Sequence, residues 1–99
     1  MMAKPPPGLI GYKRTPDFTE TNIPQGLLAE HSTKEGVWGL IHVEAGALRY
    51  WITDQRREAS EHRLTPQDAP GVVEPTILHR VEALGPVRFH VEFLRLPSD

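Results

Sequence analysis

The stretch "EHSTKEGVWGLIHVEAGALRY" (residues 30–50) decides the fold class, because it holds two short alternating apolar runs separated by a glycine. A second stretch, "VVEPTILHRVEALGPV" (residues 72–87), has the same character. In each stretch one histidine, His31 or His79, stands ahead of an alternating run. Apolar residues at every second position are typical of half-buried strands. The pattern therefore predicts β-strands, with an isolated histidine at two of their entrances.

Extended to the whole chain, the same reading predicts about seven short strands. Leu48, Tyr50 and Ile52 share one face of their run, and the last run alternates most cleanly, with Val87 and Phe89 on one side. Many short strands with frequent Pro and Gly indicate an antiparallel sandwich or barrel. We expect strands at residues 10–14, 37–43, 47–53, 61–65, 72–74, 79–84 and 87–93, turns at 44–46 and 85–86, a loop at 54–60 and one or two helical turns at 25–30.

The length of 99 residues corresponds to one domain. Three consecutive prolines make residues 1–9 a flexible or polyproline-like lead, and residues 97–99 are expected to fray. The folded domain is therefore expected to cover residues 10–96.

Composition excludes several classes of function. The net charge is −2 with both signs scattered along the chain, which argues against binding to nucleic acid or to an anionic membrane. No stretch approaches the roughly 20 apolar residues of a membrane span, and the N-terminus has no apolar run of signal-peptide length, so we expect a cytoplasmic protein. There is no cysteine, so any bound metal must have histidine, carboxylate or water ligands.

Two motifs, "HSTKEGVWG" (residues 31–39) and "EPTILHRVEALG" (residues 74–85), resemble the TehB-like tellurite-resistance domain family, and the resemblance runs from about residue 12 to residue 95. This family of small bacterial proteins implies a cupin fold, a single small antiparallel β-barrel of jelly-roll type. In some members the domain precedes a methyltransferase. The chain has no Gly-rich nucleotide loop, so methyl transfer by this chain alone is not expected.

The resemblance also implies a metal site. Metal-binding cupins carry two histidines and a glutamate in a first motif that closes on a glycine, and one more histidine in a second motif that follows a proline turn. Here Gly46, His31, Pro75 and His79 match, whereas residues 33–35 and 39 depart from the pattern. The complete set of four ligands is therefore absent.

The candidate site is one divalent ion (Zn, Fe, Ni or Mn) bound by His31 and His79 and completed by some of Glu74, His62 and His42. Each residue has a plainer interpretation. The histidine pair is explained equally by hydrogen-bonded imidazoles at a barrel rim, and Glu74 by a carboxylate that caps a turn. His62 can instead be a surface side chain, and His42 can be a side chain of the core.

Two functions follow, and whether a reaction is catalysed stays open. The first is a metal-binding cupin that handles a small anionic ligand or oxyanion in a stress response, with Lys34 attracting the anion. The alternative is a non-catalytic module without a catalytic metal that senses a small molecule or forms homo-oligomers. A homodimer is expected for both.

Overall fold

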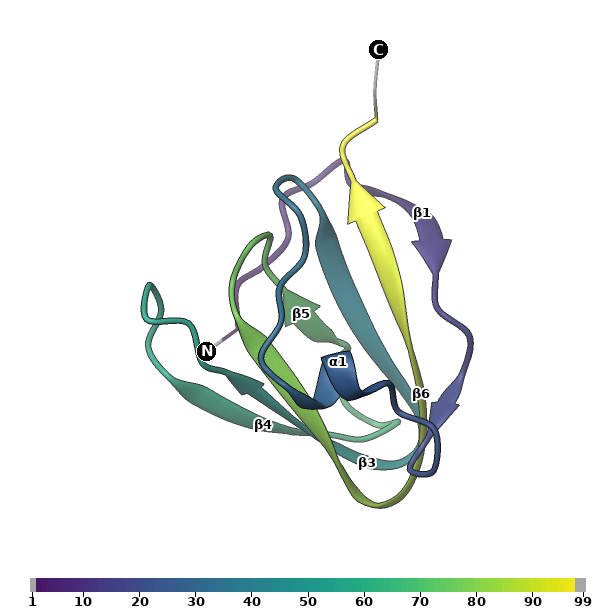
Figure 1. Ribbon diagram of the computed structural model, residues 1–99. Helices are drawn as coiled ribbons and strands as arrows, with labels where there is room; N and C mark the ends of the chain where they lie inside the picture. Colours follow the sequence, from purple (N-terminus) through teal and green to yellow (C-terminus); the bar gives the residue numbers. More distant parts are fainter. Residues whose placement is uncertain (1, 98–99) are drawn as a thin grey trace.

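The computed structural model describes residues 2–97 and is built almost wholly from antiparallel strands (Figure 1). This confirms the all-β prediction and the short helical turn, which is α1. The predicted fraying of residues 97–99 falls largely on residues 98 and 99, which lie outside the described range. The elements are β1 (Ile10–Arg14), β2 (Phe18–Thr19), α1 (Gln25–Leu28), β3 (Trp38–Ile52), β4 (Ser60–Leu64), β5 (Gly71–Val73) and β6 (His79–Arg95).

Two long strands form the frame of the molecule. β3 and β6 pair antiparallel along their whole length, from Trp38 opposite Leu94 to Ile52 opposite His79. The shorter strands extend this ladder on both sides: β4 and β5 pair with β3, whereas β1 and β2 pair with β6. In Figure 1 both long strands curve strongly at their lower end, and α1 lies in front of the resulting trough.

The curvature comes from two glycines that the sequence analysis assigned to turns. Gly46 and Gly85 both have positive φ, at 75° and 84°, in positions where the chain continues as strand. The β3–β6 register shifts between Val43 and Ala45 and again between Gly46 and Leu48, which is the signature of β-bulges. The predicted turns at 44–46 and 85–86 are therefore wrong, because each glycine bends a continuous strand without reversing it.

The sheet is open among the described residues. Its strand order is β1-β6-β3-β4, and no ladder joins β1 or β2 to β4 or β5 across the trough in residues 2–97. The closed barrel that the sequence analysis expected is therefore not confirmed. None of the helices in the described part of the chain is long and apolar enough to cross a membrane.

The core lies on the concave side of the bent sheet. Leu48, Tyr50 and Ile52 are buried as their alternation predicts, and so are Val87 and Phe89. The sequence analysis offered His42 as a core side chain. In the first half of β3, however, Ile41 is buried and His42 is not, because the bulge shifts the alternation by one residue. The buried residues that pack into one hydrophobic cluster are Ile41, Leu48, Tyr50, Ile52, Leu64, Val73, Ile77, Val81, Val87 and Phe89.

Replacing Gly46 by alanine should destabilise the fold strongly. A Cβ at this position would collide with the carbonyl oxygen of Pro86, in addition to the cost of the positive φ. We expect Gly46→Ala to lower the free energy of unfolding by about 3 kcal/mol, measured by urea denaturation. Gly85→Ala is the matched control, since its Cβ meets nothing within 4 Å and only the backbone strain of about 1 kcal/mol remains. Equal losses in the two variants would contradict a role of the Pro86 contact.

Candidate functional site

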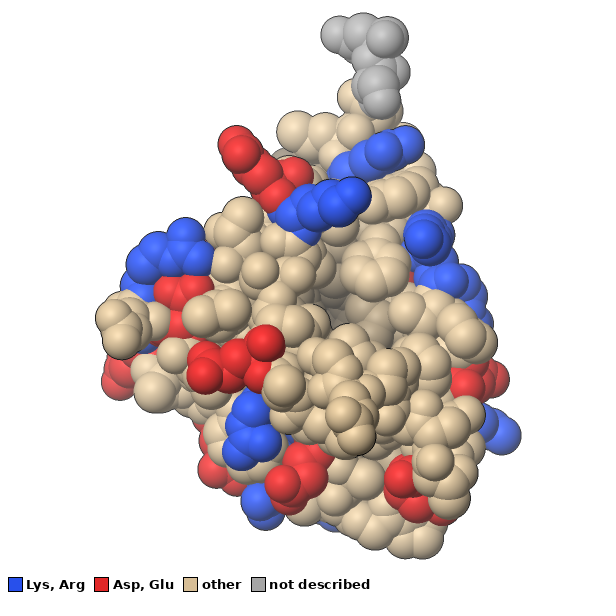
Figure 2. Space-filling view, in the orientation of Figure 1, with Lys and Arg blue, Asp and Glu red and all other residues tan. Residues whose placement is uncertain are grey.

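A cavity of about 320 Å³ opens on the concave side of the sheet. Its floor is apolar and consists of strand residues such as Ile41, Val81 and Phe89. Its rim is polar: Lys13 comes from β1, and the segment of residues 31–34 follows α1. Figure 2 shows the surface hollowed beside α1, with Lys and Arg side chains above the hollow. The cavity thus combines an apolar floor with a cationic rim.

His31 and His79 meet at this cavity. Their backbones form an isolated antiparallel bridge, in which each N–H donates to the other residue's carbonyl oxygen at 2.9 Å. The bridge places the two imidazole rings side by side, with centroids 4.1 Å apart and planes tilted by 58°. Both residues line the cavity. The chain between α1 and β3 is in this way attached to the first residue of β6.

Hydrogen bonds fix which ring nitrogen carries the proton. The Nδ1 atom of His31 lies 3.0 Å from the carbonyl oxygen of Ala29, and that of His79 lies 2.9 Å from the carbonyl oxygen of Ile77. A carbonyl oxygen only accepts hydrogen bonds, so Nδ1 is the donor in both rings. In the neutral form of either ring, Nε2 then keeps its lone pair and can accept a hydrogen bond.

His79 is a neutral imidazole at physiological pH. It is only 3% exposed, and this burial lowers the pKa of its side chain to about 4, with the neighbouring His31 lowering it further and the bond to Ile77 opposing the change. The ring of Tyr50 packs edge-on against it at 5.7 Å between centroids. The phenol of Tyr50 donates to the carbonyl oxygen of Val72 at 2.8 Å, so this wall of the site is fixed.

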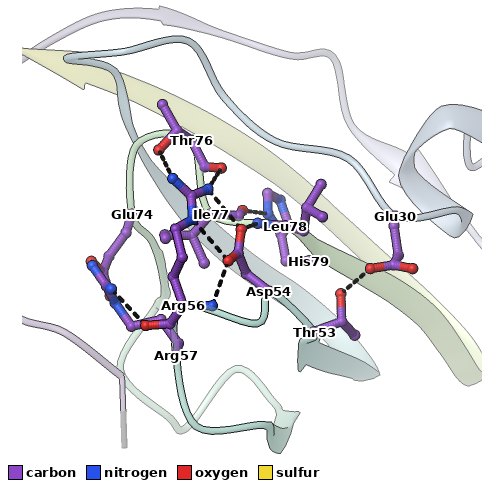
Figure 3. A network of polar contacts seen from close by, with 10 residues as sticks. All are labelled: Glu30, Thr53, Asp54, Arg56, Arg57, Glu74, Thr76, Ile77, Leu78 and His79. Atoms are coloured by element: carbon purple, nitrogen blue, oxygen red, sulfur yellow. Dashed lines mark hydrogen bonds and ion pairs between the residues drawn. The ribbon is translucent and has the colours of Figure 1, made fainter.

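A buried carboxylate holds the turn that leads into β6 (Figure 3). Asp54, 5% exposed, accepts two hydrogen bonds from the guanidinium of Arg56 at 2.9 and 2.7 Å and one from the backbone N–H of Leu78 at 2.9 Å. Arg56 also donates to the carbonyl oxygen of Thr76, a residue with a φ of 66°. The Arg56 side chain and the backbone N–H donors keep the pKa of Asp54 well below its usual range. This network fixes the backbone immediately before His79.

A second contact attaches the other side of the site. Glu30, the residue before His31, accepts a hydrogen bond from the hydroxyl of Thr53 at 2.6 Å, as Figure 3 shows. Thr53 itself donates its backbone N–H to the carbonyl oxygen of Leu78. The segment that carries His31 is therefore tied both to the end of β3 and to the turn before β6.

The three remaining predicted ligands lie elsewhere. Glu74 forms an ion pair with Arg57 at 2.7 Å, His62 contacts the hydroxyl of Ser60 at 3.0 Å, and His42 contacts Glu92 at 3.0 Å. None of the three is among the residues that line the cavity in the described part of the chain. Of the five predicted residues, the structure thus brings only His31 and His79 to one place.

A cluster that the sequence analysis did not predict lies around His90. The His90 ring stacks on His42, 4.8 Å away, and lies near Asp17 and Glu44. Within residues 2–97, Asp17, Glu44 and His90 form the one group of at least three His, Asp or Glu side chains whose ligand atoms all lie within 4.8 Å of one another. Arg14 pairs with Asp17, and Arg88 lies 3.9 Å from Glu44, so arginines already accompany both carboxylates. No signal in the sequence indicates the register that joins these residues.

Comparison with known proteins identifies the chain's relatives. The model of the TehB-like domain family matches residues 13–91. Two relatives from Haemophilus influenzae, strains Rd and 10810, are both named probable S-adenosyl-L-methionine-dependent methyltransferase TehB, and they are 42% and 39% identical over 77 residues. This alignment covers 77% of the chain but 27% of each relative, so the chain spans about a quarter of their length.

Two crystal structures share the fold. TehB from Haemophilus influenzae matches with a TM-score of 0.82 and 35% identity, over 91% of this chain and 32% of that one. A protein from Escherichia coli strain K12 matches with a TM-score of 0.82 and 23% identity, over 98% of this chain and 100% of that one. At 23% identity, the likeness to the Escherichia coli protein shows a shared fold and nothing about function.

These names correct the functional prediction. The relatives are named as methyltransferases that depend on S-adenosylmethionine, whereas the sequence analysis predicted a metal-binding cupin. The prediction of a divalent metal as the cofactor is therefore wrong, and so is the function built on it. The participation of His31, His79, Glu74, His62 and His42 in a site stays a prediction.

The low pKa of His79 predicts a loss of stability in acid. Its folded-state value of about 4 is below the ordinary value of 6.5, so between these values the unfolded chain binds more protons than the folded one. The contribution of His79 to the free energy of unfolding should therefore fall as the pH decreases from about 6.5 and level off below about 4, by about 3 kcal/mol in all. Urea denaturation at several pH values, together with NMR titration of the ring, measures both quantities.

The control is His79→Asn, which has no imidazole to protonate. Its free energy of unfolding should vary less between pH 7 and pH 4 than that of the wild type. A His79 ring that titrates near pH 6.5 in the folded protein would show that the ring is not buried as described.

Proposed function

Because this chain belongs to the TehB-like domain family, we propose that it is the ligand-binding domain of a methyl-transfer system. Its cavity holds the small anionic molecule to which an S-adenosylmethionine-dependent methyltransferase adds a methyl group. The observation that carries this proposal is the cavity itself, with the His31–His79 pair on its wall and lysines on its rim. The names of the two relatives support the link to methyl transfer.

The cavity does not suit S-adenosylmethionine itself. This cofactor carries a positive sulfonium group and a ribose whose hydroxyls proteins commonly bind through a carboxylate. The residues that line the cavity in the described part of the chain include Lys13 and Lys34 but no Asp or Glu. A cationic rim without a carboxylate repels the sulfonium and offers no acceptor pair for the ribose. We therefore assign the cofactor to a methyltransferase site other than this cavity.

An anionic methyl acceptor fits the same residues better. The two lysines attract an anion to the cavity mouth, where the field of exposed charges acts over several ångström. The Nε2 lone pairs of His31 and His79 accept a hydrogen bond from a hydroxyl or another donor on the ligand. The buried floor excludes water from the rest of the ligand. The domain would in this way retain the acceptor while the methyltransferase supplies the methyl group.

Blocking the cavity should impair methyl transfer. Ser32 lines the cavity but is exposed, so Ser32→Trp fills the mouth without disturbing the core. In Haemophilus influenzae TehB with its matched segment exchanged for this chain, we expect Ser32→Trp to raise the KM for tellurite, the anion that gives the family its name, by about tenfold. Transfer of radiolabelled methyl groups from S-adenosylmethionine is the measurement.

Gln55→Trp is the matched control, because Gln55 is also exposed but does not line the cavity. The exchanged protein with the wild-type segment must be active for the comparison to count. An unchanged KM in Ser32→Trp would exclude the cavity as the site of the methyl acceptor.

A further inference from the structure

The two halves of the cavity differ chemically. Ile41 and Val73 are 2% exposed, Val81 is 3% exposed and Phe89 is fully buried, so the floor presents only hydrocarbon. Lys13 and Lys34, in contrast, are exposed and stand at the rim. A ligand that satisfies both halves must carry its charge at one end and an apolar group at the other.

A bare inorganic oxyanion satisfies only the rim. Its charge is spread over all of its oxygens, and each of them needs water or a hydrogen-bond donor. Within the described residues the floor offers no such donor, and the cations are confined to the mouth. Moving the whole anion onto the floor therefore leaves part of its charge without partners, which is costly.

The size of the cavity leads to the same conclusion. Its volume of about 320 Å³ is room for roughly ten water molecules at about 30 Å³ each. A small oxyanion occupies a minor part of this space and leaves the rest as water against apolar walls. An alkyl group on the anion displaces that water and covers the floor, which is favourable in proportion to the apolar area buried.

We infer, on the basis of the proposed function, that the cavity is built for a small organic monoanion, with the charged group between the lysines and an alkyl group on the floor. In a methyl-transfer system such a ligand is an acceptor that already carries carbon, as a partly methylated anion does. The domain would then retain the methylated form more tightly than the bare anion. The inference involves no chemical step in this cavity.

A series of carboxylates tests this inference, since formate, acetate, propanoate and butanoate share one charge and differ by one carbon each. We expect isothermal titration calorimetry of the 99-residue chain at pH 7, with EDTA present, to show affinity rising about fourfold with each added carbon. The increase should stop when the alkyl group fills the floor.

Two variants separate the halves of the cavity. Lys13→Ala combined with Lys34→Ala should weaken all four carboxylates by a similar factor and leave the increment per carbon unchanged. Val91→Thr keeps the shape of a cavity-lining side chain but adds a hydroxyl, so it should reduce the increment and affect formate least. The melting temperature of each variant checks that the fold is intact.

The outcomes distinguish the two proposals. If none of the four carboxylates binds to a folded wild-type chain, the proposed anion-binding function fails, and this inference fails with it. If all four bind with equal affinity, or formate binds most tightly, the anion site stands and the inference about the organic ligand is overturned.

Discussion

The reciprocal pair of backbone hydrogen bonds between His31 and His79 is the constraint on which the site depends. The sheet is open among the described residues, so the ladder alone does not hold the segment between α1 and β3 over the trough. The bridge does, at 2.9 Å in both directions, and a further bridge between Thr33 and Pro75 extends it. Without these contacts the cavity would lose the wall that carries its polar groups.

The bridge in turn needs a fixed partner at the start of β6. The turn before His79 includes a residue at positive φ, Thr76, whose strain must be offset by its surroundings. Asp54 and Arg56 supply this support from the end of β3, because the buried carboxylate binds the backbone of Leu78 while the guanidinium binds that of Thr76. The ion pair of Asp54 with Arg56 thus serves to place a histidine.

Sequence alone predicted most of the strand segments and much of their inward faces, but it missed β2 and divided β3 and β6 into two strands each. The alternation of Leu48, Tyr50 and Ile52 is local information, and the structure buries all three. The turns at 44–46 and 85–86 were wrong for an equally local reason: a glycine at positive φ permits a reversal and also a bulge, and only the pairing of β3 with β6 along its whole length decides between them.

The site was predictable only in part. The pairing of His31 with His79 rested on a resemblance, since nothing in either stretch states the register that joins them. Glu74 was expected beside them, but Arg57 binds it, and this competition depends on how the 54–60 loop folds back. The apolar floor was missed because alternation shows on which face of a strand a side chain lies, but not whether that face lines a cavity. The metal was wrong because a pair of histidines looks the same in a sequence whether or not it binds a metal.

The most direct test of this account is the tautomer of the two rings, observed by long-range proton–nitrogen correlation NMR at neutral pH. The bonds to Ala29 and Ile77 predict that both His31 and His79 carry their proton on Nδ1, and the bridge predicts nuclear Overhauser contacts between the two rings. Protons on Nε2, or the absence of any contact between the rings, would contradict the claim that backbone hydrogen bonds build this wall of the cavity.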